Sequence, residues 1–287
     1  MCIRDRYYEE SKGSAQVKSC IMLAALNTPG ITKIKCKPSR NHTELLFKHL
    51  KLNINIQKKN GYDVIKIKGG KQYKGFNYII PGDISSASFF IVLTLLSKNS
   101  KLVIKNINVN ETRTGIIDIL KKMNGKIILK NKRYYKGEKV ADIQVMSSNK
   151  LKSVNCPKEM NSRLIDELPL IFLVCAKAKG ISRFENLEEL RHKESDRLKL
   201  SSKFLNMIGI KNEININSFK IKGNPNLLLS KNFTVKDFFK DHRIFMMSVI
   251  SALSFGGEWK IYDPISVKTS FPSFFKKIRE IDKLNKN

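Results

Sequence analysis

The sequence predicts an α/β protein built from repeated units. A small polar loop, a short apolar helix, a turn and a strand follow one another in this order four times along the chain. The anchor residues of these loops lie 70, 80 and 77 residues apart, at Gln16, Ser86, Asp166 and Arg243. Units of this length that mix helix and strand favour a repeated α/β architecture over a solenoid of short repeats.

Each element of the unit has its own signal. The apolar helices are expected at residues 17–26, 87–96, 168–178 and 244–255. The strands that follow them are expected at residues 31–36, 102–107, 181–184 and 259–262. A second helix follows each strand after a polar start, and in the second unit its apolar residues recur at helical spacing. The first three units then continue into alternating, strand-like segments such as 62–67 and 126–129.

The composition is that of a globular protein with an unusual charge. The chain has 287 residues, 41% of them hydrophobic, and no apolar stretch approaches the roughly 18 residues of a membrane span. Its 54 basic and 25 acidic residues give a net charge of +29. Nucleic-acid binding is one interpretation of this charge. A lysine-rich, solvated surface is the alternative that we favour, because the charge is spread along the chain and forms no aromatic-interleaved stripe.

The five cysteines are scattered and show no paired spacing. We therefore expect reduced thiols and a cytoplasmic protein. Cys20 and Cys175 lie inside apolar helical runs and are expected in the core.

The loop before each apolar helix is a candidate anion site. Free backbone N–H groups and the helix dipole attract anions at a helix start. Polar side chains stand at each of these positions: Ser14 and Gln16, Ser85 and Ser86, Asp166, and Asp241 with Arg243. Helix capping is the alternative role for the serines and aspartates.

The segment from Arg191 to Arg197 is the densest charge cluster of the chain. Lys193 and Arg197 are four residues apart, which would place them on one helix face and leave room for an anion between them. Glu194 could hold Arg197 as an ion pair. The alternative is a solvated helix face with alternating charge.

Four segments resemble motifs of the EPSP synthase family in order and spacing: residues 13–19, 81–88, 190–198 and 241–243. The Leu-Arg-His-Lys-Glu-Ser-Asp-Arg string of residues 190–197 is the most specific of them. The Ser-Ala-Gln form of residues 14–16 and the segment 39–44 are similar to the branch called class II.

The resemblance implies the enolpyruvyl transferase fold, with two domains of three similar units each. Four of those six units are expected here. Residues 1–128 would form an incomplete N-terminal domain and residues 129–287 the C-terminal domain. The family's lysine-serine-arginine and asparagine-glycine-threonine loops have no counterpart in this sequence. Residues 1–6 do not fit the family pattern, and we expect them to be foreign to the protein. We therefore expect a fragment that is poorly active or inactive alone.

The resemblance also implies a reaction. The enolpyruvyl group of phosphoenolpyruvate would move to the 5-hydroxyl of shikimate 3-phosphate, with loss of phosphate and without a metal or other cofactor. Asp166 would take the hydroxyl proton and Glu194 would assist. The residues that would hold shikimate 3-phosphate are Ser14, Ala15, Gln16, Arg40, Ser86, Asp166 and Lys193. Those that would hold phosphoenolpyruvate are Gln16, Arg197, Arg243 and Lys268.

Other functions stay open at this point. A sister enzyme transfers enolpyruvyl to UDP-N-acetylglucosamine on the same fold. A basic nucleic-acid-binding protein and a non-catalytic remnant are alternatives from other classes. The resemblance favours small-molecule substrates, a monomer, and no specific nucleic acid or membrane partner.

Overall fold

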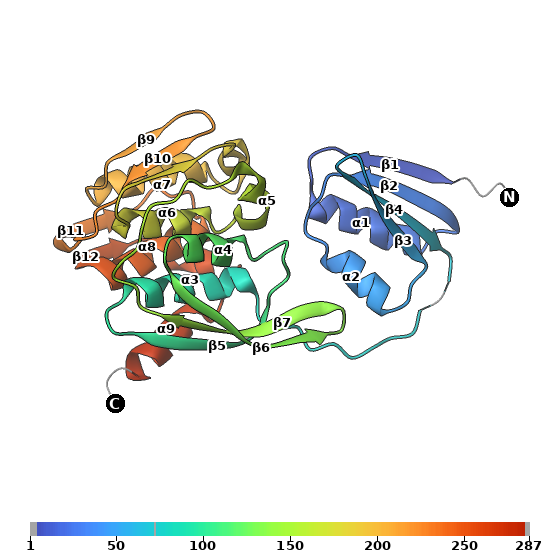
Figure 1. The fold of residues 1–287 in the computed structure, drawn as a ribbon, viewed down its shortest axis with the longest axis horizontal. Coiled ribbons are helices and arrows are strands. Elements are labelled where there is room, and N and C mark those ends of the chain that lie inside the picture. The colour runs from blue at the N-terminus through green and yellow to red at the C-terminus, as the bar shows by residue number, and fades with distance from the viewer. Residues whose placement is uncertain (1–4, 72, 285–287) are drawn as a thin grey trace.

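The computed structural model describes residues 5–71 and 73–284. Figure 1 shows two lobes: a smaller one built from the first two helices and four strands, and a larger one that holds the rest of the chain. Most of the predicted foreign start, residues 1–4, lies outside the described residues. Of the remainder, Asp5 accepts a hydrogen bond from Ile31 N and Arg6 begins the first strand.

The smaller lobe is one α/β unit. Its elements are β1 (Arg6–Glu10), α1 (Ala15–Leu26), β2 (Gly30–Cys36), α2 (His42–His49), β3 (Ile54–Lys59) and β4 (Tyr62–Gly69). The sheet order is β1-β2-β4-β3, with β1 parallel to β2 and the other pairs antiparallel. A small core lies between the sheet and the helices, because alternate strand residues point to the same face. Its buried residues include Met22, Ile34, Phe47, Ile65 and Ile67.

The larger lobe opens with a second unit of the same kind. Its elements are α3 (Ile84–Leu96), β5 (Lys101–Asn108), α4 (Gly115–Lys122), β6 (Lys126–Tyr135) and β7 (Glu138–Met146). The strands form an antiparallel sheet in the order β5-β7-β6.

Two further units complete the larger lobe. The third contains η1 (Lys158–Met160), α5 (Asn161–Leu164), α6 (Leu168–Lys177), β8 (Ile181–Phe184), η2 (Glu188–His192), α7 (Arg197–Met207), β9 (Asn212–Ile214) and β10 (Phe219–Lys222). Its sheet order is β8-β10-β9. The fourth contains β11 (Leu229–Val235), α8 (His242–Phe255), β12 (Gly256–Ile261), η3 (Pro264–Val267) and α9 (Phe274–Leu284), with β11 parallel to β12.

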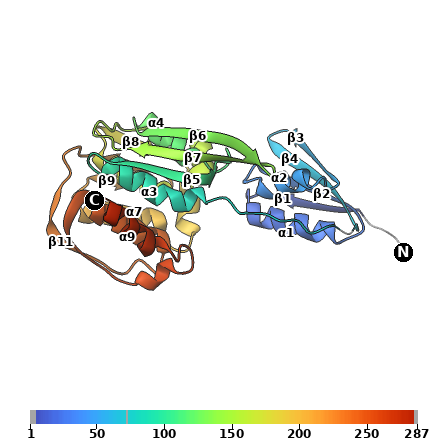
Figure 2. The same ribbon diagram turned by 90° about the horizontal axis from the view of Figure 1, so that it is seen from below.

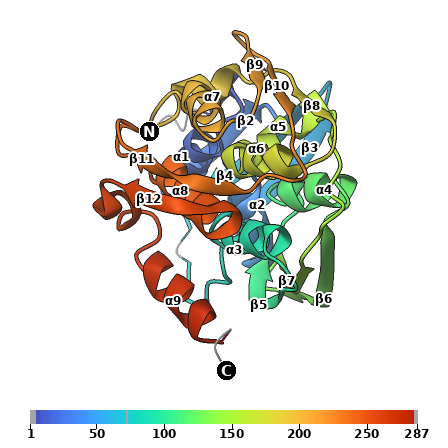
Figure 3. The same ribbon diagram turned by 90° about the vertical axis from the view of Figure 1, so that its left-hand side faces the viewer.

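The predicted repeat and α/β fold class are confirmed. The apolar helices α3, α6 and α8 pack against one another at the centre of the larger lobe, and its sheets lie outside them (Figure 3). This arrangement explains why these helices are apolar around most of their circumference: each is covered by neighbours on several sides. Asp241 caps α8 through its carboxylate, as its sequence position predicts, whereas α3 begins at Ile84 with Asp83 as its cap, ahead of the predicted start at residue 87.

Residues 70–71 and 73–80 lie between the elements of the two lobes, which lie side by side in Figure 2. The turn between β6 and β7 approaches α2, since a Cβ atom at Gly137 would lie 2.8 Å from the carbonyl oxygen of Leu45. The predicted domain boundary between residues 128 and 129 falls within β6, and the larger core cluster has members on both sides of it. That residues 1–128 and 129–287 form separate domains stays a prediction.

The cysteines fit the core prediction only in part. Cys175 is buried, and burial raises the pKa of its thiol to about 12. Cys20 is exposed, so its predicted core position is wrong. The buried residues of α1 are Lys18, Met22, Ala25 and Leu26, which form one face that leaves position 20 outside.

No helix within residues 5–71 and 73–284 has both the length and the apolar character needed to cross a bilayer.

Candidate active site

Asp166 lies just before α6, and three arginines from other parts of the chain surround it. Arg40 Nη2 is 2.5 Å from Asp166 Oδ2, Arg197 Nη1 is 3.6 Å from Oδ1, and Arg243 Nη2 is 3.7 Å from Oδ2. Arg243 Nη1 also donates to the backbone oxygen of Asp166 at 3.0 Å. Burial alone would raise the pKa of Asp166, but Arg243, Arg40 and Lys193 outweigh it and hold the pKa well below its ordinary value.

Arg197 is the first residue of α7, and its side chain is only 1% exposed. Its Nε lies 2.9 Å from Asp241 Oδ2, and its Nη2 donates to Glu194. Asp241 also accepts from the Ser195 hydroxyl at 2.8 Å while it caps α8. Burial raises and Arg197 lowers the pKa of Asp241, with a net shift downward. Asp241 is therefore a charged bridge between the starts of α7 and α8.

The N-terminal ends of four helices meet around this cluster. Asp166 precedes α6, Arg197 starts α7 and Arg243 lies in the first turn of α8. The start of α3 joins them because Ser85 Oγ donates to Glu167. Helix starts carry free N–H groups and a positive dipole end, so this junction offers hydrogen-bond donors for anions beside the arginines, whose charges are paired with carboxylates here.

The smaller lobe contributes residues to the same side. Ser14 caps α1, Ala15 is its first residue, and Gln16 is exposed. This loop lies beside the segment before Arg40, since a Cβ atom at Gly13 would be 3.6 Å from Lys37 Cβ. The first turns of α1 and α2 are joined by a hydrogen bond between the hydroxyls of Ser19 and Thr43, 2.7 Å apart. The predicted substrate-binding residues of this lobe therefore lie on the side that carries Arg40.

The remaining predicted residues differ in their surroundings. Ser86 lies in the first turn of α3, and its hydroxyl donates to the capping carboxylate of Asp83 at 3.1 Å. Lys193 Nζ is 2.5 Å from Glu189 Oε1. Lys268 is exposed, and within the described part of the chain no hydrogen bond or ion pair joins its side chain to the Asp166 cluster. Its role stays a prediction.

The helix-face argument for Lys193 and Arg197 is wrong. Residue 193 is extended, η2 ends at His192 and α7 begins at Arg197, so the two side chains do not share a helix face. The predicted ion pair between Glu194 and Arg197 is confirmed. Because Asp196 caps α7 with its side chain, the helix starts directly after it.

Sequence reasoning missed two further members of the cluster. Glu167, next to Asp166, is fully buried, and Arg113 donates to the Ser85 hydroxyl at 2.6 Å. Burial and the nearby Arg40 lower the pKa of Arg113. Arg113 is the last residue of the polar segment 110–113, which indicated only the start of a helix. Nothing in the sequence marked Arg113 as a site residue. Only packing brings it to Ser85.

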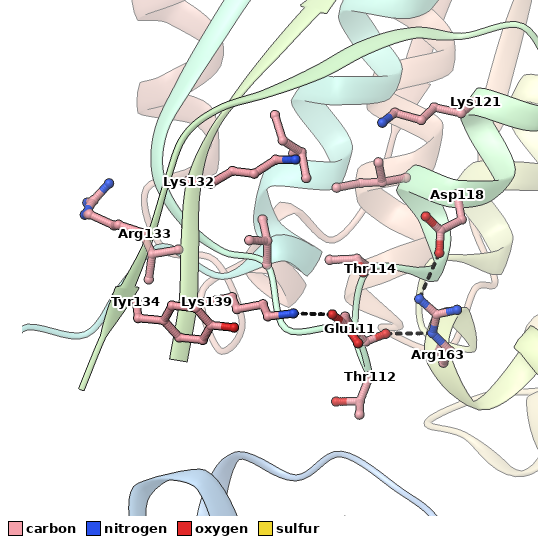
Figure 4. Close-up of a pocket in the computed structure, with 14 residues that line it drawn as sticks. Glu111, Thr112, Thr114, Asp118, Lys121, Lys132, Arg133, Tyr134, Lys139 and Arg163 are labelled. Carbon is pink, nitrogen blue, oxygen red and sulfur yellow. Dashed lines mark hydrogen bonds and ion pairs between the residues drawn. The ribbon is translucent and has the colours of Figure 1, made fainter. Parts of the chain in front are cut away.

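A cavity lies away from this cluster. It has a volume of about 730 Å³, lies beside α4 and β6, and contains none of the predicted site residues (Figure 4). Its carboxylates are already paired, Asp118 with Arg163 at 2.8 Å and Glu111 with Lys139. A smaller cavity of about 440 Å³ lies at the junction of the lobes, where Arg113, His42 and Glu138 are among its lining residues.

Comparisons with known proteins agree with this fold. The family model of EPSP synthase (3-phosphoshikimate 1-carboxyvinyltransferase) matches residues 3–278. The 3-phosphoshikimate 1-carboxyvinyltransferase of Ruthia magnifica is 40% identical over 276 residues, which cover 96% of this chain and 62% of the relative. The 3-phosphoshikimate 1-carboxyvinyltransferase of Thermoanaerobacter sp. is 42% identical over 273 residues, which cover 62% of that relative. The chain thus spans about 62% of the length of these relatives.

Comparison with solved structures supports the same fold. EPSP synthase from Acinetobacter baumannii superposes with a TM-score of 0.83 at 31% identity, over 94% of this chain and 61% of that one. The enolpyruvyl transferase NikO from Streptomyces tendae superposes with a TM-score of 0.67 at 14% identity, over 90% of this chain and 57% of that one, and shows the fold alone. These similarities show that the chain has the enolpyruvyl transferase fold. Within this class, the chain belongs to the EPSP synthase family.

Proposed function

We propose that the protein containing this chain transfers the enolpyruvyl group of phosphoenolpyruvate to the 5-hydroxyl of shikimate 3-phosphate. The observation that carries the proposal is the Asp166 carboxylate among Arg40, Arg197 and Arg243, which come from both lobes. Both proposed substrates carry a phosphate and a carboxylate. Arginine suits such groups, because its planar fork can donate two parallel hydrogen bonds to one oxyanion.

Asp166 is the proposed base for the 5-hydroxyl proton. With its pKa held low by cations, it is a weak base in this arrangement. Bound phosphate and carboxylate groups would take up hydrogen bonds of Arg40, Arg243 and Lys193 and offset their charge. The pKa of Asp166 would then rise toward a useful range, so that substrate binding itself activates the base.

The reaction consists of an addition and an elimination. The 5-hydroxyl oxygen bonds to C2 of the enolpyruvyl group while its proton leaves to Asp166, and C3 gains a proton to give a tetrahedral intermediate. Loss of a proton from C3 and of phosphate from C2 then restores the double bond. Glu194 is the proposed second proton-transfer group, and its side chain, 54% exposed, stands at the edge of the cluster.

The cations have distinct proposed roles. Arg40 and Lys193 would hold shikimate 3-phosphate together with Ser14, Ala15, Gln16 and Ser86. Arg243, with Gln16 and Lys268, would hold phosphoenolpyruvate. Arg197 is buried against Asp241 and Glu194, so it reaches a ligand directly only when Glu194 moves aside. We further propose a monomeric, cytoplasmic protein without sequence-specific nucleic-acid binding.

Calorimetric titration of the purified chain with shikimate 3-phosphate tests the proposal. Binding should be seen in the wild type and weakened by Lys193→Ala. Lys220→Ala is the matched control, because Lys220 is an exposed lysine that also pairs with one glutamate, Glu213, at 3.3 Å. A folded chain that binds neither shikimate 3-phosphate nor phosphoenolpyruvate would contradict a functional site in this chain. That result would favour the alternative of a non-catalytic remnant.

A further inference from the structure

Glu167 is a buried carboxylate that the proposed reaction does not use. It follows Asp166 directly, and it is 1% exposed. Its Oε1 accepts a hydrogen bond from the Ser85 hydroxyl and lies 3.7 Å from Arg243 Nη1. Burial raises its pKa although Arg243 and Ser85 act in the opposite direction. A carboxylate in such a place is costly to bury, so its partners are informative.

The partners of Glu167 extend to the start of α4. Arg113 Nη2 donates to the Ser85 hydroxyl at 2.6 Å and lies 3.1 Å from Asp83 Oδ1. Glu167, Ser85 and Arg113 thus form a connected chain of side chains, which we call the Glu167 network. It links the starts of α3, α4 and α6.

The backbone around the network is tightly packed. A Cβ atom at Gly115 would lie 3.0 Å from the backbone carbon of Arg163, in the short helix before Asp166. Arg163 Nε also donates to the backbone oxygen of Glu111 at 2.6 Å. The loop before α4 and the segment before Asp166 therefore hold each other in place, and the Glu167 network adds a side-chain link to this contact.

Arg243 is the residue of the proposed ligand site that faces Glu167. Its Nη1 faces both Glu167 Oε1 and the backbone oxygen of Asp166, while its Nη2 faces the Asp166 carboxylate. With Nη1 held from one side, the planar guanidinium can present Nη2 in only one direction. Without Glu167, one of the two contacts of Nη1 would be lost and the group could rotate.

We propose that Glu167 is a positioning residue that fixes the direction of the Arg243 guanidinium relative to Asp166, with Ser85 and Arg113 holding Glu167 in turn. The inference rests on the proposed function, in which Arg243 holds phosphoenolpyruvate. Glu167 touches no reacting atom. Its effect reaches the ligand through Arg243, so it concerns phosphoenolpyruvate and not shikimate 3-phosphate.

The first test is calorimetric titration of the Glu167→Gln chain with each ligand separately. Glutamine keeps the shape and an acceptor for Ser85 but removes the charge that faces Arg243. We expect phosphoenolpyruvate to bind about tenfold more weakly, because the ion-pair contact of 3.7 Å that orients Arg243 is lost. The affinity for shikimate 3-phosphate should change by less than about threefold, because Arg243 is not proposed to hold that ligand. Asp118→Asn is the control, because it removes a carboxylate facing an arginine outside the cluster.

The second test measures Arg243 without any ligand. Rotation of its guanidinium is followed by nitrogen-15 nuclear magnetic resonance, with Arg243→Lys used to assign the signal. Rotation should be faster in Glu167→Gln and, to a smaller extent, in Ser85→Ala, and unchanged in Asp118→Asn. Ser85→Ala serves if Glu167→Gln does not fold. A wild-type chain that binds no phosphoenolpyruvate would count against the proposed function, while the rotation still decides the role of Glu167.

Unchanged rotation in both network variants would overturn the proposal. Equal weakening of both ligands in Glu167→Gln would overturn it as well, because it would indicate a general loss of structure instead of an effect on Arg243.

Discussion

Arg40 and Asp166 are 126 residues apart in the chain and lie in different lobes, yet Arg40 Nη2 is 2.5 Å from Asp166 Oδ2. Two further links cross the same junction: His42 Nδ1 lies 2.5 Å from Glu138 Oε1, and Asn110 Nδ2 donates to Asn41 Oδ1 at 2.9 Å. All three residues of the smaller lobe come from the short segment at the start of α2. This segment therefore sets how the smaller lobe meets the proposed base.

Arg40→Ala should weaken the binding of shikimate 3-phosphate by about 10- to 100-fold, the range for a lost charged hydrogen bond. It removes the cation closest to the Asp166 carboxylate, so the pKa of Asp166 should rise as well. Calorimetry gives the affinity, and carbon-13 resonance of the carboxyl group gives the pKa. Arg133→Ala is the control, since the exposed Arg133 side chain lies outside the Asp166 cluster and donates to Asn131 O and Asn106 Oδ1. An equal effect of both substitutions would contradict the role of Arg40.

Asp166 should make stability depend on pH on the acidic side. Its folded pKa lies below the ordinary value of 3.8, so the folded state favours the carboxylate. This contribution is complete above about pH 4 and is lost as the pH falls toward the folded pKa. The free energy of unfolding of wild type and Asp166→Asn should therefore differ most at neutral pH and converge on acidification. A difference that does not change with pH would contradict the prediction.

Arg197→Met should destabilise the chain by about 3–5 kcal/mol, because it leaves the buried Asp241 carboxylate without its main partner. Urea unfolding monitored by circular dichroism measures the loss. Lys220→Met removes a pair that is exposed on both sides and should cost about 1 kcal/mol or less. A cost for Arg197→Met as small as that for Lys220→Met would show that the cluster does not stabilise the starts of α7 and α8.

The pair of His42 and Glu138 should couple the two lobes. Burial raises the pKa of Glu138, but bonds from His42 and from asparagines outweigh it and lower the pKa below its ordinary value. A double-mutant cycle of His42→Ala and Glu138→Gln should give a coupling of about 1 kcal/mol at neutral pH. The coupling energy should fall as the pH drops through the ordinary pKa range of glutamate, because Glu138 takes up a proton there in the unfolded state. A coupling near zero at neutral pH would mean that the pair does not hold the lobes together.

Cysteine labelling checks the packing of the apolar helices. Burial raises the pKa of Cys36 and Cys156 to about 11 and that of Cys175 to about 12, so these thiols should not react near neutral pH. Cys20 is exposed and should be alkylated by iodoacetamide. Mass spectrometry of the digested protein identifies the labelled residues. Labelling of Cys175 in the folded protein would contradict the buried position of α6.

The elements of the fold could be predicted because their signals are local. Helix α8, for example, follows from a capping aspartate, Asp241, ahead of an apolar run that ends at Gly256. The exposed position of Cys20 could not be predicted in this way, because α1 is apolar on both faces and only the packing of its sheet decides which face is covered. The error about Lys193 and Arg197 has a local cause, because Asp196 caps α7 and the helix therefore begins after Lys193.

The sequence by itself determined the repeated α/β unit, the polar starts of its helices and the resemblance to one enzyme family, because capping residues, apolar periodicity and motifs act over a few neighbouring residues. Only the tertiary structure decided which side chains meet. The pairing of Arg40 with Asp166, the Glu167 network and the burial of Arg197 join segments tens of residues apart. Such contacts depend on how units pack and on how desolvation and charge balance in the space between them, and no local pattern records that balance.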